Sequence, residues 1–151
     1  MQVEFHMFRT IGSLKELNLY LYVLDIIHNH MSGRYAKCWQ LTAAAVRLMT
    51  GLQLNWEAPN SRRPFKEREC VRRLAWQIFQ LDRVFAGGFN AYICCHEDIM
   101  KIPLPCAQDA FDADTEVQVE YLQGSVAGNS SPPGLHGYHI RLVSIRHNIQ
   151  T

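Results

Sequence analysis

The chain has 151 residues, of which 48% are apolar and 19% are charged, and its formal net charge is +1. This length and balance indicate one globular domain with a substantial core and exclude a wholly disordered protein. A net charge so close to zero provides no global field that would attract DNA or an anionic membrane, so binding to either would need a local patch.

The five cysteines are odd in number and scattered along the chain. They lack both the short paired spacing of a zinc site and the density of a secreted disulfide framework. No basic, apolar leader of the secretory type opens the sequence. We therefore expect a reduced, intracellular protein.

The first predicted helix covers residues 14 to 29. It is apolar almost all round, and such a helix is expected to sit between others. The apolar run from 17 to 27 falls well short of the ~20 residues that cross a bilayer, so we expect no membrane anchor. The single polar stripe of this helix consists of Asn18, Tyr22, Asp25 and Asn29.

A second helix is predicted from Tyr35 to Leu52, after a turn at Ser32 and Gly33. Three consecutive alanines, residues 43 to 45, keep this helix slim and allow another helix to approach closely. Its expected buried face consists of Cys38, Trp39, Thr42, Ala45, Val46, Met49 and Leu52.

A third helix is predicted from Pro64, which suits a first helical turn, to Gly87 and Gly88, which can end a helix in the left-handed conformation. Glu69 lies three and four residues before Arg72 and Arg73, so both arginines have a carboxylate partner on their own helix. The apolar stripe of this helix consists of Val71, Leu74, Ala75, Ile78, Phe79, Leu81 and Phe85.

Asp82 is out of place in this helix. It lies within or beside the apolar stripe, near the helix end where the dipole disfavours an anion. A buried carboxylate without a partner would be strongly destabilising. We therefore expect Asp82 to fasten helices together by pairing with an arginine from another element, for which Arg47 is one candidate.

The rest of the chain completes an all-α prediction. Residues 89 to 105 are expected to be extended, since two prolines close the segment. Residues 106 to 136 are acidic and then rich in Gly, Ser and Pro, which predicts a mobile loop. Helical spacing resumes after residue 137 with a narrow apolar face of Ile140, Val143, Ile145 and Ile149. The predicted fold is a helical array of three long helices plus a partial C-terminal helix, joined by an extended Leu-Pro segment and a mobile loop.

No residue cluster makes a strong catalytic or metal site. His28 and His30 point to different sides of a helix, and no third ligand has a suggestive spacing. The neighbours Cys94 and Cys95 are expected to be one exposed and one buried thiol. An enzyme built on these cysteines and His96 stays an alternative, but no glycine-rich elbow or orienting partner accompanies them.

Residues 62 to 73 form a basic run of six cations and two acids. As a nucleic-acid patch this run would neutralise several phosphates and bind with a steep salt dependence. The favoured interpretation is a helix start whose charges are locally paired, because Glu67 and Glu69 dilute the patch.

Several short motifs occur in a fixed order between residues 69 and 105. They are Glu69, Arg72-Arg73, Ala75-Trp76, Leu81-Asp82-Arg83, Asp98-Ile99 and Leu104-Pro105. In this order they resemble the regulatory, or middle homology, domain of fungal zinc binuclear cluster transcription factors. Upstream, residues 43 to 55 are similar to that family's Ala-Val-Arg segment through Arg47, Leu48, Leu52 and Leu54. The resemblance covers most of residues 14 to 149.

Three departures from the family pattern stand out. Ala75 replaces the first tryptophan of an aromatic pair. Gln53 stands where the family ends a helix with glycine, and a left-handed residue other than glycine there costs about 1 kcal/mol. The six-cysteine DNA-binding cluster is absent from the sequence.

The resemblance implies that this chain is the regulatory domain of a nuclear transcription factor. This domain would not itself contact DNA. It implies no cofactor in this chain, with zinc only in the missing DNA-binding module. It also implies a partial domain, made of a helical core (14–105), a flexible loop (106–136) and the start of a further helix (137–151). Helix faces meant for the missing portion would then be exposed.

The partners implied are proteins or a second copy of the chain, and a small-molecule effector. DNA would be reached only through the missing module, and no membrane is expected. An alternative is a stand-alone helical interaction domain that dimerises with a full-length relative. None of the signature residues is expected to be catalytic; they are Arg47, Glu69, Arg72, Arg73, Trp76, Asp82, Arg83, Asp98, Leu104 and Pro105.

Overall fold

A computed structural model describes residues 15–57, 62–124 and 130–150. In these ranges the chain forms helices and connecting segments, with isolated β-bridges instead of strands. The all-α prediction is therefore confirmed. The elements are α2 (Glu16–Met31), α3 (Tyr35–Gly51), α4 (Phe65–Ala86), η1 (Asn90–Tyr92), η2 (Glu97–Ile99), α5 (Gln108–Asp112) and α6 (Leu135–Gln150).

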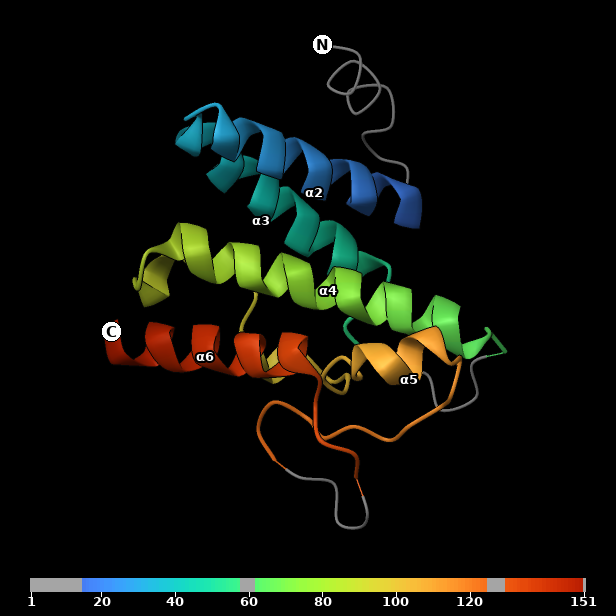
Figure 1. Cartoon of the computed structure of the whole chain (residues 1–151). Coiled ribbons are helices and arrows are strands. Elements are labelled where there is room, and N and C mark those ends of the chain that lie inside the picture. Colours follow the sequence, from blue (N-terminus) through green and yellow to red (C-terminus); the bar gives the residue numbers. More distant parts are fainter. Residues whose placement is uncertain (1–14, 58–61, 125–129, 151) are drawn as a thin grey trace.

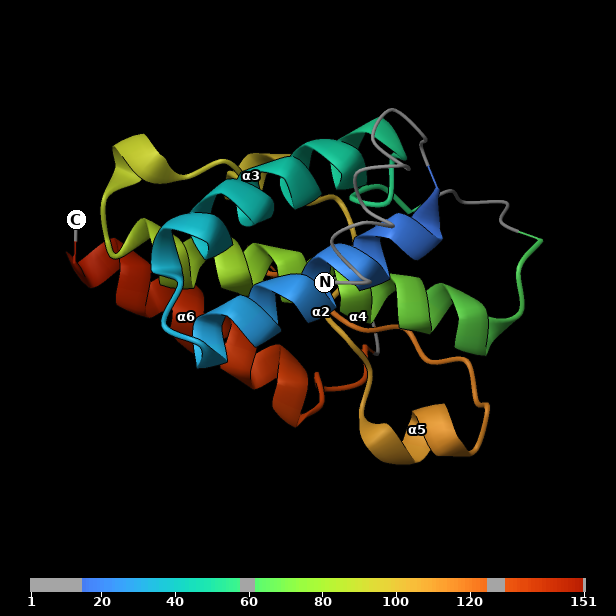
Figure 2. The ribbon, with the colours of Figure 1, turned by 90° about the horizontal axis from the view of Figure 1, so that it is seen from above.

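Helix α4 lies at the centre of the molecule. The α2–α3 pair packs on one side of it, and α6 lies along the other side (Figure 1). The view from above shows α4 running between α3 and α6 (Figure 2). The helix starts after Pro64 and ends where Gly87 adopts a left-handed backbone with φ of 60°, as the sequence predicts. Because α4 has neighbours on several sides, it buries charged as well as apolar side chains.

Helix α2 is oriented with its polar stripe inward, contrary to the expectation of a helix enclosed by others. Asn18, Asp25 and Asn29 are buried, and the Asn29 side-chain amide donates to the backbone carbonyl and to the Oδ1 of Asp25. Leu17 and Leu24 are exposed instead. The periodicity located the polar stripe correctly, but it could not show which of the two faces would find a partner.

Helix α3 follows the prediction closely. Most of its expected face is buried, whereas Trp39 is nearly half exposed and packs edge-to-face on Tyr92 of η1. After the helix, Gln53 has a φ of 57°, and the Leu54 N–H donates to the Met49 carbonyl. Gln53 therefore adopts the left-handed backbone conformation expected at this position, where glycine would be preferred. This conformation costs about 1 kcal/mol for a residue other than glycine.

The segment expected to be a mobile loop contains regular and buried structure. Residues 108–112 form helix α5, and Val119 is buried in the main core. The Leu104 N–H donates to the Glu120 carbonyl, which fixes the returning chain against the Leu-Pro segment. Residues 108–112 are therefore helical where a loop was expected, because so short a helix gives little periodic signal. Residues 125–129 of the expected loop lie outside the described residues.

Helix α6 begins at Leu135 and is as long as α2. Ile140 and Val143 are buried as predicted, but Ile145 and Ile149 are exposed. The inward positions on those turns belong to Ser144 and His147. None of the described helices combines the length and hydropathy needed to cross a membrane.

Candidate functional site

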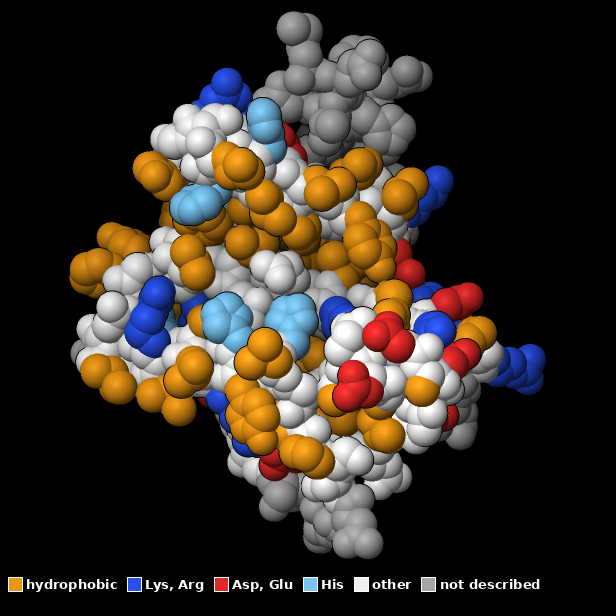
Figure 3. All heavy atoms as spheres, in the orientation of Figure 1, with side chains coloured by type: hydrophobic (Ala, Val, Ile, Leu, Met, Phe, Trp, Pro, Cys, Tyr) orange, Lys and Arg blue, Asp and Glu red, His pale blue; other side chains and the backbone are white. Residues whose placement is uncertain are grey.

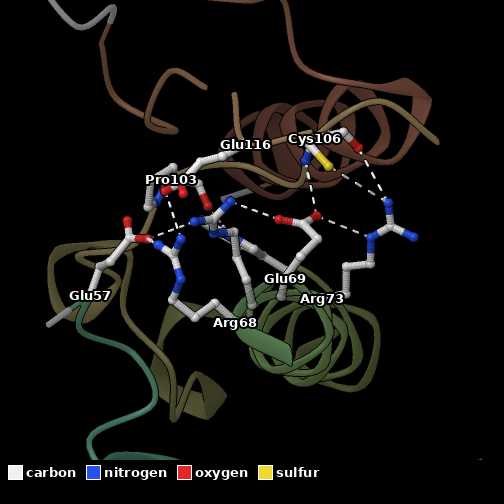
Figure 4. Close-up of polar contacts among 9 residues, drawn as sticks. Glu57, Arg68, Glu69, Arg73, Pro103, Cys106 and Glu116 are labelled. Atoms are coloured by element: carbon white, nitrogen blue, oxygen red, sulfur yellow. Dashed lines mark hydrogen bonds and ion pairs between the residues drawn. The ribbon is translucent and has the colours of Figure 1, made fainter. Parts of the chain in front are cut away.

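Residues 89–105, which were expected to be extended throughout, contain the short helices η1 and η2. Most of the signature residues meet where α4 contacts the extended segment that follows η2 and ends in Leu104 and Pro105. Side chains from the first half of α4 point toward this segment and hold its backbone (Figure 4). We call this arrangement the clamp, and it consists of Glu69, Arg72, Arg73 and Trp76 together with residues 103–106.

Glu69 is the centre of the clamp and its side chain is fully buried. One carboxylate oxygen accepts from Arg72 Nη1 at 2.7 Å. The other accepts from Arg73 Nε at 3.0 Å and from the Cys106 backbone N–H at 3.0 Å. The pairing with both arginines is confirmed. Burial makes it far more consequential than the few tenths of a kcal/mol that such pairs contribute on an exposed helix.

A second layer of carboxylates surrounds the arginines (Figure 4). Arg72 Nη2 donates to Glu57 Oε1 at 2.6 Å, and Arg68 Nη2 donates to Glu116 Oε1 at 2.6 Å. Arg63 pairs with Glu16 at 2.6 Å. The interpretation of the basic run as locally paired charges is confirmed only at Glu69, and the other carboxylates that engage these guanidinium groups come from three other segments of the chain.

Arg73 connects the clamp to α5. Its guanidinium lies 4.2 Å from the centroid of the Phe111 ring, and its Nη1 donates to the Gln108 side chain at 3.0 Å. A cation held over an aromatic ring gains about 0.5–2 kcal/mol depending on its exposure. The clamp thus reaches the segment that the sequence had suggested to be a loop.

Trp76 holds the carbonyl side of the extended segment. Its indole N–H donates to the Pro103 carbonyl at 2.7 Å, and its ring packs edge-to-face on Phe79 at 5.3 Å. Leu104 and Pro105 are buried beside it. Side chains of α4 thus supply backbone partners that a neighbouring strand could provide: Trp76 donates to the Pro103 carbonyl, and Glu69 accepts from the Cys106 N–H.

Asp82 forms a second fastening point near the other end of α4, but not the one expected. Its carboxylate accepts from the Cys94 N–H at 3.1 Å and from the Cys95 N–H at 2.9 Å. The cation near it is Arg83 of the same helix, with Nη1 3.6 Å away. The prediction of an arginine from another element was wrong, and Arg47 is exposed on α3. Backbone donors fill this role, and a sequence gives no signal for them.

Burial has the largest effect on the pKa values of Asp82 and Arg83 at this second fastening point. Burial raises the pKa of Asp82, while the two backbone N–H groups and Arg83 act in the opposite direction. Burial also lowers the pKa of Arg83, which Asp82 opposes. The Arg83 guanidinium lies 4.6 Å from the Phe79 ring centroid. In this buried site, the opposite charge of each group favours the ionised form of the other.

The signature residues do not all share one site. Asp98 is exposed in η2 and, like Arg47, lies outside the clamp. The sequence also missed three partners, namely Glu57, Glu116 and the buried Asn55, whose side-chain amide donates to the Ile99 carbonyl at 2.6 Å. They lie in segments without periodicity, so only the folded chain brings them close.

The cysteines offer no activated nucleophile. Cys94 is exposed and Cys95 is buried, which confirms the expected division. Burial, then the Asp82 carboxylate, raises the pKa of Cys95 to about 12, and burial also raises the pKa of Cys94. A thiol enzyme requires the opposite shift.

We expect iodoacetamide at pH 8 to modify native Cys95 at least ~1,000-fold more slowly than an exposed thiol, because only ~1 in 10,000 such groups is ionised at a pKa of about 12. Peptide mass spectrometry over a time course measures each site, with exposed Cys70 as the internal reference. Reaction of Cys94 or Cys95 faster than Cys70 would contradict this and restore the thiol-enzyme alternative.

The described residues do not suit the zinc that the family resemblance associates with a DNA-binding module. Within the described ranges, no three His, Cys, Asp or Glu side chains lie together as a metal site. His28 and His30 are both exposed on α2.

Comparison with known proteins places the chain among transcription factor domains. The family model described as "Fungal specific transcription factor domain" matches residues 23–149. The chain is 29% identical over 115 residues to the Zn(2)-C6 fungal-type transcription factor FTF1c of Fusarium oxysporum f. sp. lycopersici, covering 70% of this chain and 12% of that protein. It is 26% identical over 160 residues to the Uncharacterized transcriptional regulatory protein C530.11c of Schizosaccharomyces pombe, covering 89% of this chain and 19% of that protein.

A further relative, FTF1a of the same Fusarium, is 34% identical over 86 residues, which is 51% of this chain and 8% of that protein. The chain thus spans less than a fifth of the length of each of these relatives. No solved structure matches the chain.

Proposed function

Because this chain belongs to the fungal specific transcription factor domain family and so has a role in regulating transcription, we propose that it is the regulatory, non-DNA-contacting part of a longer zinc cluster factor. The observation that carries the proposal is the family match itself, which runs from within α2 to the end of α6. The small share of each relative that the chain covers supports a longer polypeptide.

In this proposal the chain acts in the nucleus, without enzymatic activity and without a cofactor of its own. DNA is contacted by a separate six-cysteine zinc module, and the arginines of this chain serve its own architecture. The pairing of the basic run with Glu57, Glu69 and Glu116 supports this division of labour, because paired guanidinium groups have little charge left for phosphates.

The proposed mechanism is a helical packing with two states, whose balance a ligand or protein partner shifts. A groove of about 590 Å³ between α4, α5 and α6 suits a small effector, since Arg73 and Cys106 of the clamp line it together with apolar side chains of α6. A ligand there would touch the clamp directly. Its binding energy could then bias how tightly α4 holds the extended segment.

The proposal is tested by fusing the whole chain to an unrelated DNA-binding module in a yeast host and measuring a reporter gene. We expect the fusion to change reporter output several-fold relative to the module alone. The Glu69→Ala variant should lose this change, whereas Glu67→Ala, which alters an exposed acid on the same helix, should keep it. An unchanged reporter at equal protein level would overturn the regulatory role.

A second candidate is a stand-alone helical domain that pairs with a full-length relative. The exposed apolar face of α2 favours it, because such a face suits a protein partner. Sequencing the genomic DNA on both sides of the reading frame separates the two. An adjoining six-cysteine exon supports the longer factor, and stop codons in every frame on both sides overturn it in favour of the stand-alone domain.

A further inference from the structure

Helix α2 exposes a continuous apolar stripe. Its members recur at alternating spacings of three and four residues, which is the heptad pattern of a helix that packs along another helix. Apolar side chains gather along α2 in Figure 3. We call this stripe the α2 seam, and it consists of Leu17, Tyr20, Leu24, Ile27 and Met31.

The seam cannot turn inward to join the core. The opposite side of α2 carries Asp25 and Asn29, which are buried and hydrogen-bonded to each other at 2.9 Å. The Cys38 thiol of α3 also donates to the Ile26 carbonyl at 3.4 Å. Rolling the helix would break these contacts and expose Leu19 and Ile26, so the seam is available only to something outside the described chain.

The exposed area is large enough to hold two proteins together. The exposed fractions are 63% for Leu17, 39% for Tyr20, 61% for Leu24, 41% for Ile27 and 82% for Met31. At roughly 200 Å² for each fully exposed side chain of this size, the seam offers about 550 Å². Two such seams facing each other would bury about 1,100 Å², which reaches the area that a specific interface needs.

The charge pattern favours a second copy of the same surface. Between residues 17 and 31 the only fixed charge is Asp25, and its side chain is buried toward α3, where Lys37 lies 3.9 Å away. Identical seams can therefore meet without like-charge repulsion. Leu24 is the middle member of the seam, so it lies near the twofold axis of a symmetric pair whether the two helices run parallel or antiparallel.

Helix α6 provides a natural comparison, because it repeats the same pattern of residue types. Its exposed apolar stripe, the α6 seam, consists of Leu135, Tyr138, Leu142, Ile145 and Ile149. Two arginines lie beside it: Arg146 is exposed, and Arg141 pairs with Glu120 at 3.0 Å. Two copies of α6 would bring the two Arg146 side chains into one interface, which like-charge repulsion disfavours.

We propose that two copies of this chain associate through their α2 seams in a symmetric pair, with Leu24 at the centre. This inference deepens the proposed function by naming a partner and a surface, and in that respect it rests on the proposed function. The association itself is a property of the purified chain alone. The chain could therefore fail to dimerise while the transcriptional role stands, or it could dimerise while the transcriptional role fails.

The test is sedimentation equilibrium of the full chain over protein concentrations from about 1 to 200 µM. The wild-type chain should show a monomer–dimer equilibrium. Leu24→Glu should raise the dissociation constant at least ~100-fold, because two carboxylates would then face each other in an apolar contact. Leu142→Glu is the matched control: this leucine is the middle member of the α6 seam, its exposed fraction is 63%, and its substitution should leave the constant within about threefold.

Circular dichroism must show equal helix content and a similar Tm for both variants, which is expected for exposed positions. A milder variant, Leu24→Cys in a background with Cys70 and Cys94 replaced by serine, should form a disulfide with its own copy under mild oxidation. A wild-type chain that stays monomeric at every concentration would overturn the proposal. So would a dimer that Leu24→Glu leaves intact, or one that Leu142→Glu disrupts equally.

Discussion

Replacing Glu69 with alanine is expected to lower the free energy of unfolding by about 3–5 kcal/mol, the cost of breaking a buried ion pair from one side. The substitution removes the carboxylate that Arg72 Nη1, Arg73 Nε and the Cys106 N–H all share. Arg72 would keep Glu57, but its other nitrogen would stay buried without an acceptor. Since whole domains are stable by only about 5–15 kcal/mol, a loss of this size approaches global unfolding.

Urea unfolding followed by circular dichroism at 222 nm measures this loss, provided that the slope of free energy against urea does not change. Glu67→Ala is the control, because Glu67 is exposed two residues away on the same helix, and a change within about 0.5 kcal/mol is expected. If Glu69→Ala does not fold, Glu69→Gln keeps the shape and should still lose about 1–3 kcal/mol. Equal effects of the substitutions at 67 and 69 would show that the clamp contributes no special stability.

Much of the clamp could be predicted from the sequence because its first contacts are local. Arg72 and Arg73 follow Glu69 by three and four residues, a spacing that places them on one helix face whatever the rest of the chain does. The helix ends were predictable for the same reason, since Pro64 and Gly87 act through their own backbone preferences. Local chemistry therefore identified Glu69 and its two arginines, whereas Trp76, Leu104 and Pro105 were identified by the family resemblance.

What the sequence could not predict is the partner of each buried charge. Glu69 and Asp82 both accept from backbone N–H groups, those of Cys106 in one case and of Cys94 and Cys95 in the other. Every residue except proline carries such a donor, so no residue type marks the position. The orientation of α2 was unpredictable for a related reason: both of its faces could pack, and the contact with α3 decided which one did.

The two buried acids together suggest what α4 does in the fold. Glu69 holds residue 106 near one end of the helix, and Asp82 holds residues 94 and 95 near the other. The Trp76 indole, which holds the Pro103 carbonyl, lies between them in the sequence. Helix α4 thus fixes the segment from Cys94 to Cys106, which includes η2, at three points through side chains. This segment supplies part of the hydrophobic core, so the polar contacts of α4 hold one part of the core against another; its core members are Cys95, Met100, Ile102, Leu104 and Cys106.

Replacing Asp82 with alanine is expected to lower the free energy of unfolding by about 2–4 kcal/mol. Arg83 would remain buried without its carboxylate, and the Cys94 and Cys95 N–H groups would lose their acceptor. The expected loss is smaller than that at Glu69 because burial already raises the pKa of Asp82, which means that the ionised form is partly penalised in the folded chain. Hydrogen exchange gives the local readout: the amides of Cys94 and Cys95 should lose protection before those of the α4 core.

The raised pKa of Asp82 also determines how its contribution to the free energy of unfolding changes with pH. A carboxyl group whose folded pKa exceeds its unfolded value stabilises the fold at low pH and loses that contribution as the pH rises above about 4 toward the folded pKa. Asp82→Asn does not titrate, so the advantage of the wild type over this variant should shrink over that interval. Asp98→Ala, at an exposed acid of the same family motif set, should cost no more than about 0.5 kcal/mol. A widening gap with rising pH would contradict the raised pKa of Asp82. A cost at residue 98 equal to that at residue 82 would contradict the buried-fastener account.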